Sequence, residues 1–431
     1  MSARAMLLAA AALLISPQTA QAADTAFVGA RLVIGDGSAP IENGTLVLRD
    51  GKVLAAGAGV AVPPGAKVID VKGQWVTPGL VLAITDLGLV DVGQVDDSND
   101  SGADKAPFAA ALDIAPAINP AAQPIAINRG QGITRAAVAP LGTSAIFEGQ
   151  GAVIDLGDDP QAVTQPRAFQ YVELGEDGAR LAGGSRIAAH AVLRNALEEA
   201  RELAANPAAP RRDDVLLTRR DAQALIGVVT GKQPLFVHVE RAADIRMALA
   251  LRSEFPALKL VLVGVSEGWM VAKEIAAAGV PVLASPLNDL PARFEMLGAT
   301  QSNVGRMVKA GVKVGLSSGA SNSPGMTQYA GNLVGLSKVP GASGLTWGQA
   351  FAAITSTTAE VLGLGERFGS LRPGRAGDVV IWDGDPLEVS SGVVRVWIDG
   401  AEQSLTNHQT RLRDRYAGSP SEGALPKAYD R

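Results

Sequence analysis

Residues 259–282, KLVLVGVSEGWMVAKEIAAAGVPV, predict a strand, a helix and a second strand in close succession. The run LVLVGV is apolar at consecutive positions, which is typical of a strand that is buried on both faces of a sheet. A helical stretch, residues 268–278, follows it, and a second apolar run begins at Val280. Buried strands that alternate with helices favour a parallel sheet.

The same alternation extends over most of the chain. Other helical stretches cover residues 187–203 and 242–254, and each is flanked by apolar runs. These runs are ITRAAVAP (133–140), PLFVHVE (234–240), GVPVLASP (279–286) and VKVGLSSG (312–319). Repetition in this number predicts an α/β fold, a (β/α)8 barrel of the TIM type. Residues 86–129 are instead polar, acidic and rich in proline, so we interpret them as a long excursion over the barrel mouth.

The two ends of the chain differ from the middle. Residues 27–76 alternate apolar and polar positions and break at glycine-rich turns, with Asp50-Gly51 as a hairpin turn. Similar strands return near the C-terminus in GDVVIWDGDP and VVRVWIDGAEQSL. We therefore expect a small composite β-sandwich domain of residues 23–77 and 369–405, a barrel domain of residues 78–368, and a C-terminal tail of residues 406–431.

The composition narrows the classes of function. Apolar residues make up 47% of the chain and charged residues 19%, and the net charge is −5. A large core is therefore available, and nucleic acid is not indicated as a partner. The chain has no cysteine, which excludes disulfides, thiol nucleophiles and cysteine-ligated zinc.

The N-terminus has the pattern of a secretory signal peptide. Arg4 precedes an apolar run, residues 6–15, and Ala20-Gln21-Ala22 offers small residues at a cleavage site. The apolar run is too short to span a bilayer as a mature helix, so we expect no membrane span. These features predict a signal peptide of residues 1–22 and a periplasmic location.

Three segments carry a resemblance to a known family. NGTLVLRDGKVLAAG, WVTPGL and GSLRPGRAGDVVIWDGDPL resemble framing segments of the amidohydrolase superfamily, in its imidazolonepropionase-like and prolidase-like branch. PLFVHVERAADI is similar to the fifth barrel strand of that family, and residues 259–282 to its sixth strand and helix. The resemblance implies a TIM-type barrel, a β-sandwich built from both ends, and a hydrolase of carbon–nitrogen bonds.

The family's usual metal site is degenerate in this sequence. The resemblance implies a His-x-His pair on strand one, a bridging lysine or glutamate, histidines on strands five and six, and an aspartate on strand eight. The chain has only three histidines, His190, His238 and His408, and only His238 matches that pattern. The other positions carry different residues: Ile84 and Asp86 on strand one, Gly264 on strand six, and Ser317, Ser318 and Gly319 on strand eight.

Four side chains are expected to meet at the barrel rim: Asp86, His238, Glu240 and Glu267. Residues two apart on a strand share a face, so His238 and Glu240 point the same way, and active sites of this fold lie at the C-terminal ends of the strands. We predict Asp86, His238 and Glu240 as catalytic residues. Arg241, Glu267 and Ser318 are the predicted substrate contacts.

The sequence does not decide whether the site binds a metal ion. Asp86, His238 and Glu240 are weak candidates for at most one loosely held zinc or manganese ion, since one imidazole and two carboxylates form a hard donor set. The alternatives are a metal-free polar pocket, or a polar cluster without function in which Glu240, Arg241 and Asp244 stabilise the start of the next helix. A serine nucleophile from Ser317, Ser318 or Ser321 lacks a local signature.

Other chemically notable residues have plainer interpretations. His190 lies in an amphipathic helical pattern and His408 in a polar tail. The acidic residues between positions 96 and 104 do not match an EF-hand and indicate a solvated loop. Trp269 and Trp347 are predicted to pack on barrel helices.

Two hypotheses about function follow. The first is an exported amidohydrolase-type hydrolase that acts on a carbon–nitrogen bond of a small amide, lactam or dipeptide-like substrate through an altered site. The second is a catalytically inactive, metal-free binding or partner subunit with the same fold. A small molecule is the expected ligand, and a homo-oligomer or a pairing with a full-site homologue stays open.

The signal-peptide prediction has a direct test. N-terminal sequencing of the protein from the periplasmic fraction should return Ala23 as the first residue, because cleavage follows the small residues at Ala20 and Ala22. Recovery of Met1 or Ser2 at the N-terminus of that fraction would contradict it.

Overall fold

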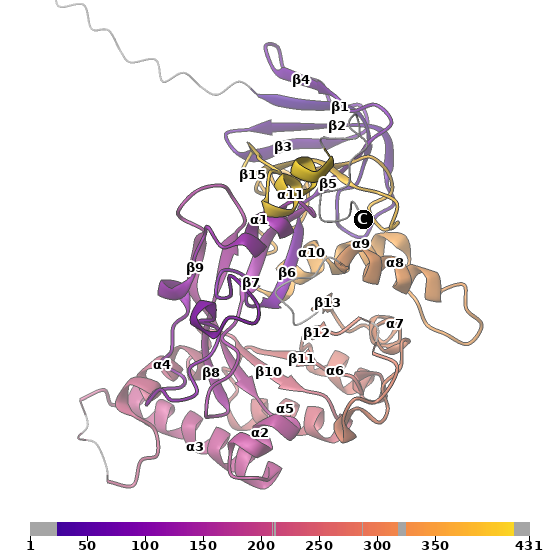
Figure 1. The fold of residues 1–431 in the computed structure, drawn as a ribbon. Coiled ribbons are helices and arrows are strands. Elements are labelled where there is room, and N and C mark those ends of the chain that lie inside the picture. Colours follow the sequence, from indigo (N-terminus) through magenta and orange to yellow (C-terminus); the bar gives the residue numbers. More distant parts are fainter. Residues whose placement is uncertain (1–23, 209, 211–212, 287, 318–324, 418–431) are drawn as a thin grey trace, which may run out of the picture.

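The computed structural model describes residues 24–208, 210, 213–286, 288–317 and 325–417. They form two eight-stranded sheets with helices packed around one of them (Figure 1). One sheet curves into a nearly closed barrel, and the other is built from both terminal segments. The predicted α/β barrel with a β unit from the two ends is confirmed. The exact domain boundaries stay a prediction.

The barrel strands follow one another in chain order. Neighbouring strands are parallel, except that β8 is antiparallel to both β7 and β9. The connections on either side of β8, residues 139–146 and 156–162, are too short for the helical crossover that a parallel pair requires. In order, the strands are β6 (Leu80–Thr85), β7 (Ile133–Val138), β8 (Phe147–Asp155), β9 (Val163–Glu173), β10 (Leu235–Val239), β11 (Leu260–Gly264), β12 (Val282–Ala284) and β13 (Val314–Leu316).

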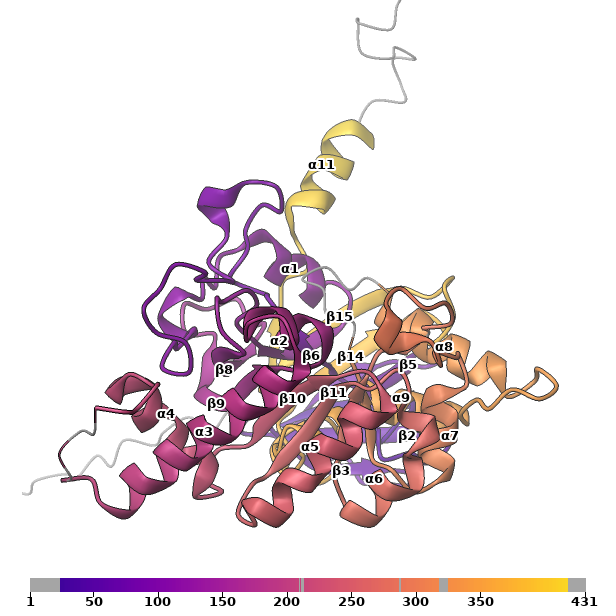
Figure 2. The ribbon, with the colours of Figure 1, turned by 90° about the horizontal axis from the view of Figure 1, so that it is seen from below.

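Ten described helices accompany the barrel, and α3, α5 and α6 lie along its outer face (Figure 2). They are α1 (Gln123–Arg129), α2 (Gly175–Leu181), α3 (Arg186–Ala205), α4 (Arg219–Val229), α5 (Ala242–Glu254), α6 (Ala272–Ala278), α7 (Asn303–Lys309), α8 (Met326–Leu336), α9 (Trp347–Ala353) and α10 (Ser356–Val361). None of the helices in the described residues is long and apolar enough to cross a membrane. His190 is half-buried in α3, and the acidic residues between positions 96 and 104 are exposed, as predicted.

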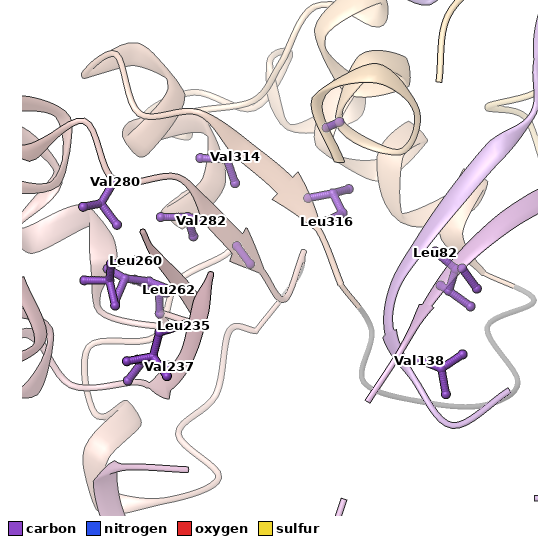
Figure 3. Packing of buried hydrophobic residues seen from close by; sticks show 14 of the residues in the cluster. Leu82, Val138, Leu235, Val237, Leu260, Leu262, Val280, Val282, Val314 and Leu316 are labelled. Carbon is purple, nitrogen blue, oxygen red and sulfur yellow. The ribbon is translucent and has the colours of Figure 1, made fainter. Parts of the chain in front are cut away.

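Strand alternation divides the barrel core into two layers. The outward side chains, such as Leu235 and Val237 on β10, pack in a cluster with the surrounding helices (Figure 3). The inward side chains form a second cluster, in which the rings of Phe169 and Phe236 stack 4.4 Å apart. Because Phe236 points inward, His238 two residues later points inward as well.

The barrel closes without a strand pair between β13 and β6. The Ser317 hydroxyl donates a hydrogen bond to the Ala83 carbonyl at 2.8 Å, and the Val81 amide donates to the carbonyl of Ile354, which follows α9. The Ser317 side chain and the end of α9 therefore connect β13 and β6, and the Ser317 hydroxyl has a structural role as a hydrogen-bond donor.

The second sheet joins strands from both ends of the chain. The central pair is β5 with β14, which run antiparallel, and the order is β16-β15-β14-β5-β1-β2-β3, with β4 beside β1. The strands are β1 (Thr25–Leu32), β2 (Ile41–Arg49), β3 (Lys52–Gly57), β4 (Lys67–Asp70), β5 (Trp75–Pro78), β14 (Val379–Trp382), β15 (Val393–Ile398) and β16 (Ala401–Gln403). After it, α11 (His408–Ala417) extends away from the body with no buried side chain, and His408 is exposed as predicted (Figure 2).

One residue, Gly79, connects this sheet to the barrel, between β5 and β6. A Cβ atom at this position would lie 2.1 Å from the Thr134 hydroxyl, which is closer than non-bonded atoms approach. The Gly79 amide donates to the carbonyl of Asp378 at 3.1 Å. Glycine is therefore required for the tight passage from one sheet to the other.

A buried ion-pair cluster joins the two sheets beside this passage. Arg135 of β7 donates two hydrogen bonds to the carboxylate of Asp378, at 2.7 and 2.8 Å, and lies 2.8 Å from Asp399 and 3.9 Å from Asp155. The side chains of Arg135 and Asp378 are 4% and 3% exposed. Burial lowers the pKa of Arg135, but the attraction of Asp378 and Asp399 outweighs it and raises that pKa above its ordinary value.

We predict that Arg135→Met lowers the free energy of unfolding by roughly 3–5 kcal/mol, because it leaves Asp378 charged and buried without a partner. Urea unfolding measures the loss. Arg395→Met is the matched control, since it removes a partly exposed pair with Glu402 and should cost about 1 kcal/mol or less. Equal losses in the two variants would show that the buried pair does not hold the sheets together.

Candidate functional site

A pocket of about 260 Å³ lies at the C-terminal ends of the barrel strands, where this fold places active sites. The excursion after β6 borders it, because the Leu141 amide donates to the Ser101 carbonyl at 2.7 Å. The pocket is lined by Ile84, Leu141, Tyr171, His238, Glu240, Val263, Gly264, Ser285, Asn288 and Ser317.

His238 is held between two carboxylates. Its Nδ1 donates to Oε1 of Glu173 at 2.6 Å, and its Nε2 donates to Oε1 of Glu240 at 3.1 Å. Carboxylates only accept, so both ring nitrogens carry protons and the imidazole is cationic. Burial lowers the pKa of His238, but Glu173 and Glu240 together raise it well above its ordinary value.

Glu240 is fixed from two sides. Its second oxygen accepts a hydrogen bond from the Ser266 amide at 2.7 Å, and the residue is 3% exposed. Burial raises the pKa of this carboxyl, but the hydrogen bonds from His238 and Ser266 bring it below its ordinary value. Glu240 is therefore an ionised carboxylate at the wall of the pocket.

Glu173 is the residue that the sequence reasoning missed. It ends β9, a strand whose first half is polar and therefore does not form a continuous apolar run. The signal was the strand-like FQYVE before the glycine-rich LGEDG. The parallel register places Glu173 directly opposite His238 on β10.

Two more titratable groups near the triad have raised pKa values. Burial raises the pKa of Glu148 to about 7, although its carboxylate accepts hydrogen bonds from the amides of Gly142 and Thr143. Burial and then the charges of Glu173, Glu148 and Glu240 raise the pKa of the Tyr171 hydroxyl well above its ordinary value. Tyr171 therefore stays neutral on the pocket wall.

The structure brings together only part of the predicted site. His238 and Glu240 line the pocket, whereas Asp86 is half-buried after β6 and is not among the lining residues. Glu267 accepts hydrogen bonds from the amides of Ala242, at the start of α5, and Gly298. Arg241 pairs with Asp244 in the first turn of α5 at 2.9 Å, and Ser318 lies outside the described residues.

The residues of the pocket do not fit the metal pair that the family resemblance implies. Both nitrogens of His238 face carboxylate oxygens at hydrogen-bonding distance, and the ends of β6, β11 and β13 offer Ile84, Gly264 and Ser317. Within the described part of the chain, no group of three or more His, Asp and Glu side chains is arranged to hold a metal ion. We therefore route no chemical step through a metal.

Backbone strain marks the same rim. Ile84 has φ 54° at the end of β6, and Val265 has φ 58° directly after β11. A positive φ is costly for a β-branched residue, by about 1–3 kcal/mol, and such strain concentrates at functional sites. Both strained residues lie beside the pocket or next to its lining residue Gly264.

Comparison with known proteins identifies the family. The model of the amidohydrolase family matches residues 184–402. The amidohydrolase tasK of Hapsidospora irregularis is 45% identical over 60 residues, and the imidazolonepropionase of Mesorhizobium japonicum is 42% identical over 45 residues. These matches cover 14% and 10% of this chain and only 6% and 11% of the two relatives.

Solved structures extend the likeness of fold to nearly the whole chain. An amidohydrolase from Thermotoga maritima MSB8 has a TM-score of 0.75 at 24% identity, covering 88% of this chain and 99% of that one. Molinate hydrolase has a TM-score of 0.54 at 17% identity, covering 94% and 98%. Because the family model spans just over half of the sequence, the chain belongs to the amidohydrolase family.

Proposed function

We propose that this amidohydrolase-family chain hydrolyses a carbon–nitrogen bond of a small substrate with the Glu173–His238–Glu240 triad in place of a metal pair. The observation that carries the proposal is the position of His238, a cationic imidazole between two carboxylates at the wall of the pocket. Family membership supports a hydrolase. The pocket volume of about 260 Å³ supports a small amide, lactam or dipeptide-like substrate.

The triad holds an acid and a base side by side. In the proposed reaction, ionised Glu240 takes a proton from a water molecule as the water oxygen attacks the carbonyl carbon. The imidazolium of His238 gives its Nε2 proton to the leaving nitrogen as the carbon–nitrogen bond breaks. The products are a carboxylic acid and an amine, and the proton on Glu240 then returns to His238. Glu173 keeps the ring in place and stabilises its positive charge.

We predict that Glu240→Gln lowers kcat by roughly 10²–10⁴-fold, with KM changed much less, because general acid–base catalysis contributes an amount of that order. The assay measures amine release from a panel of small amides, lactams and dipeptides. Chelator treatment should leave the activity unchanged. The control is Glu388→Gln, an exposed glutamate between β14 and β15, which should retain full activity.

Two results would contradict this mechanism. One is activity that disappears with chelator and returns with zinc or manganese. The other is a Glu240→Gln variant that turns over as fast as the unmodified protein.

The second candidate function is a non-catalytic binding or partner subunit. It is favoured by the engagement of both His238 nitrogens with carboxylates. It is also favoured by Ile84, Gly264 and Ser317, which line the pocket where the family resemblance implies metal ligands. If no member of the panel is hydrolysed while a small ligand binds to the pocket, this second function applies. Metal content of the mature protein, purified without chelator, adds a measurement that does not depend on the substrate.

We also propose that the protein works in the periplasm. The support is the signal-like sequence of residues 1–22, which lie outside the described residues.

The triad predicts a pH dependence of stability. The folded pKa of His238 is raised above the unfolded value of about 6.5, so its contribution is fully present below that value and is lost as the pH rises through the folded pKa. The free energy of unfolding should therefore fall more steeply, as the pH rises above about 6.5, in the unmodified protein than in His238→Gln. Urea unfolding at intervals over this range measures the difference. Parallel curves would show that His238 is not held as a cation.

A further inference from the structure

The charges at the pocket allow its ligand to be specified further. His238 and Glu240 are the only ionisable acid or base side chains among the described lining residues apart from the neutral hydroxyl of Tyr171. Glu173 lies directly behind His238, and Glu148 acts electrostatically on Glu173. The imidazolium of His238 and the carboxylates of Glu173 and Glu240 together carry a net negative charge. Glu148 adds a further negative charge as the pH rises through its pKa of about 7.

Apart from His238, no cation of the described pocket wall offsets this charge. Neither lysine nor arginine is among the described lining residues. The segments next to β12 and β13 that lie outside the described residues, Leu287 and residues 318–324, contain no charged residue in sequence.

Three arginines, of residues 186, 241 and 293, are already paired with carboxylates. Arg293 pairs with Asp177, and Arg186 bridges Asp244 at 2.8 Å and Glu295 at 2.9 Å. Arg241 also pairs with Asp244. An anionic ligand would therefore have to break one of these pairs, or enter the pocket without a counter-charge.

The remaining walls suit a neutral amide and an apolar stem. Ser285 and Asn288 supply neutral polar groups, and the Ser285 hydroxyl donates to Asn288 Oδ1 at 3.1 Å. Ile84, Leu141 and Val263 are apolar, and the Tyr171 ring is available for a cation–π contact. The binding free energy of a charged ligand group in such a partly buried pocket depends strongly on a nearby side chain of opposite charge.

We infer that the pocket selects a cationic ligand, an amide whose side chain ends in an alkylammonium or guanidinium group, and rejects carboxylates. The inference rests on the proposed function for the choice of an amide. The charge selection depends instead on Glu173, on Glu240 and on the absence of lysine and arginine from the described pocket wall. The net negative charge of the triad attracts the ammonium into the pocket, and Ser285 and Asn288 supply its neutral polar contacts.

Three blocked amides of matched length test this selection. Nα-acetyl-lysinamide, Nα-acetyl-norleucinamide and Nα-acetyl-α-aminoadipic acid α-amide differ mainly in a terminal ammonium, methyl or carboxylate group. Titration calorimetry at low ionic strength should show the lysine compound binding at least about tenfold more tightly than the norleucine compound, with the carboxylate compound weakest. The preference should shrink as salt is added, because salt screens the attraction.

Two variants and a control assign the effect to the pocket. Glu240→Gln and, independently, Glu173→Gln should each reduce the preference for the lysine compound, so the test does not depend on one variant folding. Glu388→Gln removes the same charge outside the barrel and should leave the preference unchanged.

Binding and turnover separate the two proposals. Selective binding of the lysine compound without amine release supports this inference and refutes hydrolysis of that amide. Preferred binding or hydrolysis of the norleucine or carboxylate compound overturns the inference and leaves a hydrolase. Failure of all three compounds to bind also overturns it.

Discussion

A guanidinium buried at the junction of two sheets is the constraint on which the rest of the molecule depends. Arg135 belongs to the barrel, and its strongest partner, Asp378, leads into the strand that pairs with β5 in the other sheet. Both side chains are almost completely buried, so removing one partner would leave the other charge buried and unpaired. With Gly79 as the only residue between β5 and β6, the barrel base has one position relative to the terminal sheet, and the strand ends at the opposite rim are fixed in turn.

At that rim, the barrel strands hold the Glu173–His238–Glu240 triad. The family's barrel geometry is retained, as the likeness to the Thermotoga structure shows, while a triad of one imidazole and two carboxylates occupies the pocket. The main chain restrains the triad as well, because the Ser266 amide holds Glu240 and the β9–β10 register sets Glu173 opposite His238. Glu267, one residue beyond Ser266, serves instead to satisfy the start of α5.

Sequence patterns were sufficient for the barrel and for two of the three residues of the triad. Consecutive apolar runs gave the parallel strands, and the two-residue period correctly put His238 and Glu240 on one face. Glu173 could not be found this way, because its strand is polar at the start and its proximity to His238 depends on pairing across 65 residues. Glu267 was correctly placed just after its strand, but its direction is set by amides 25 and 31 residues away, which no local pattern encodes.

The reversed strand β8 has a consequence for how the chain folds. Two short hairpin connections join the β7–β8–β9 meander. Its strand pairs therefore form between residues that are near in sequence, and the entropy cost of loop closure is small. Closure at the other side of the barrel brings Ser317 to Ala83 across 234 residues. We therefore expect the meander to act as an early nucleus and the β13–β6 seam to be completed last, which makes that seam the weakest line of the barrel and the first to open in the native state.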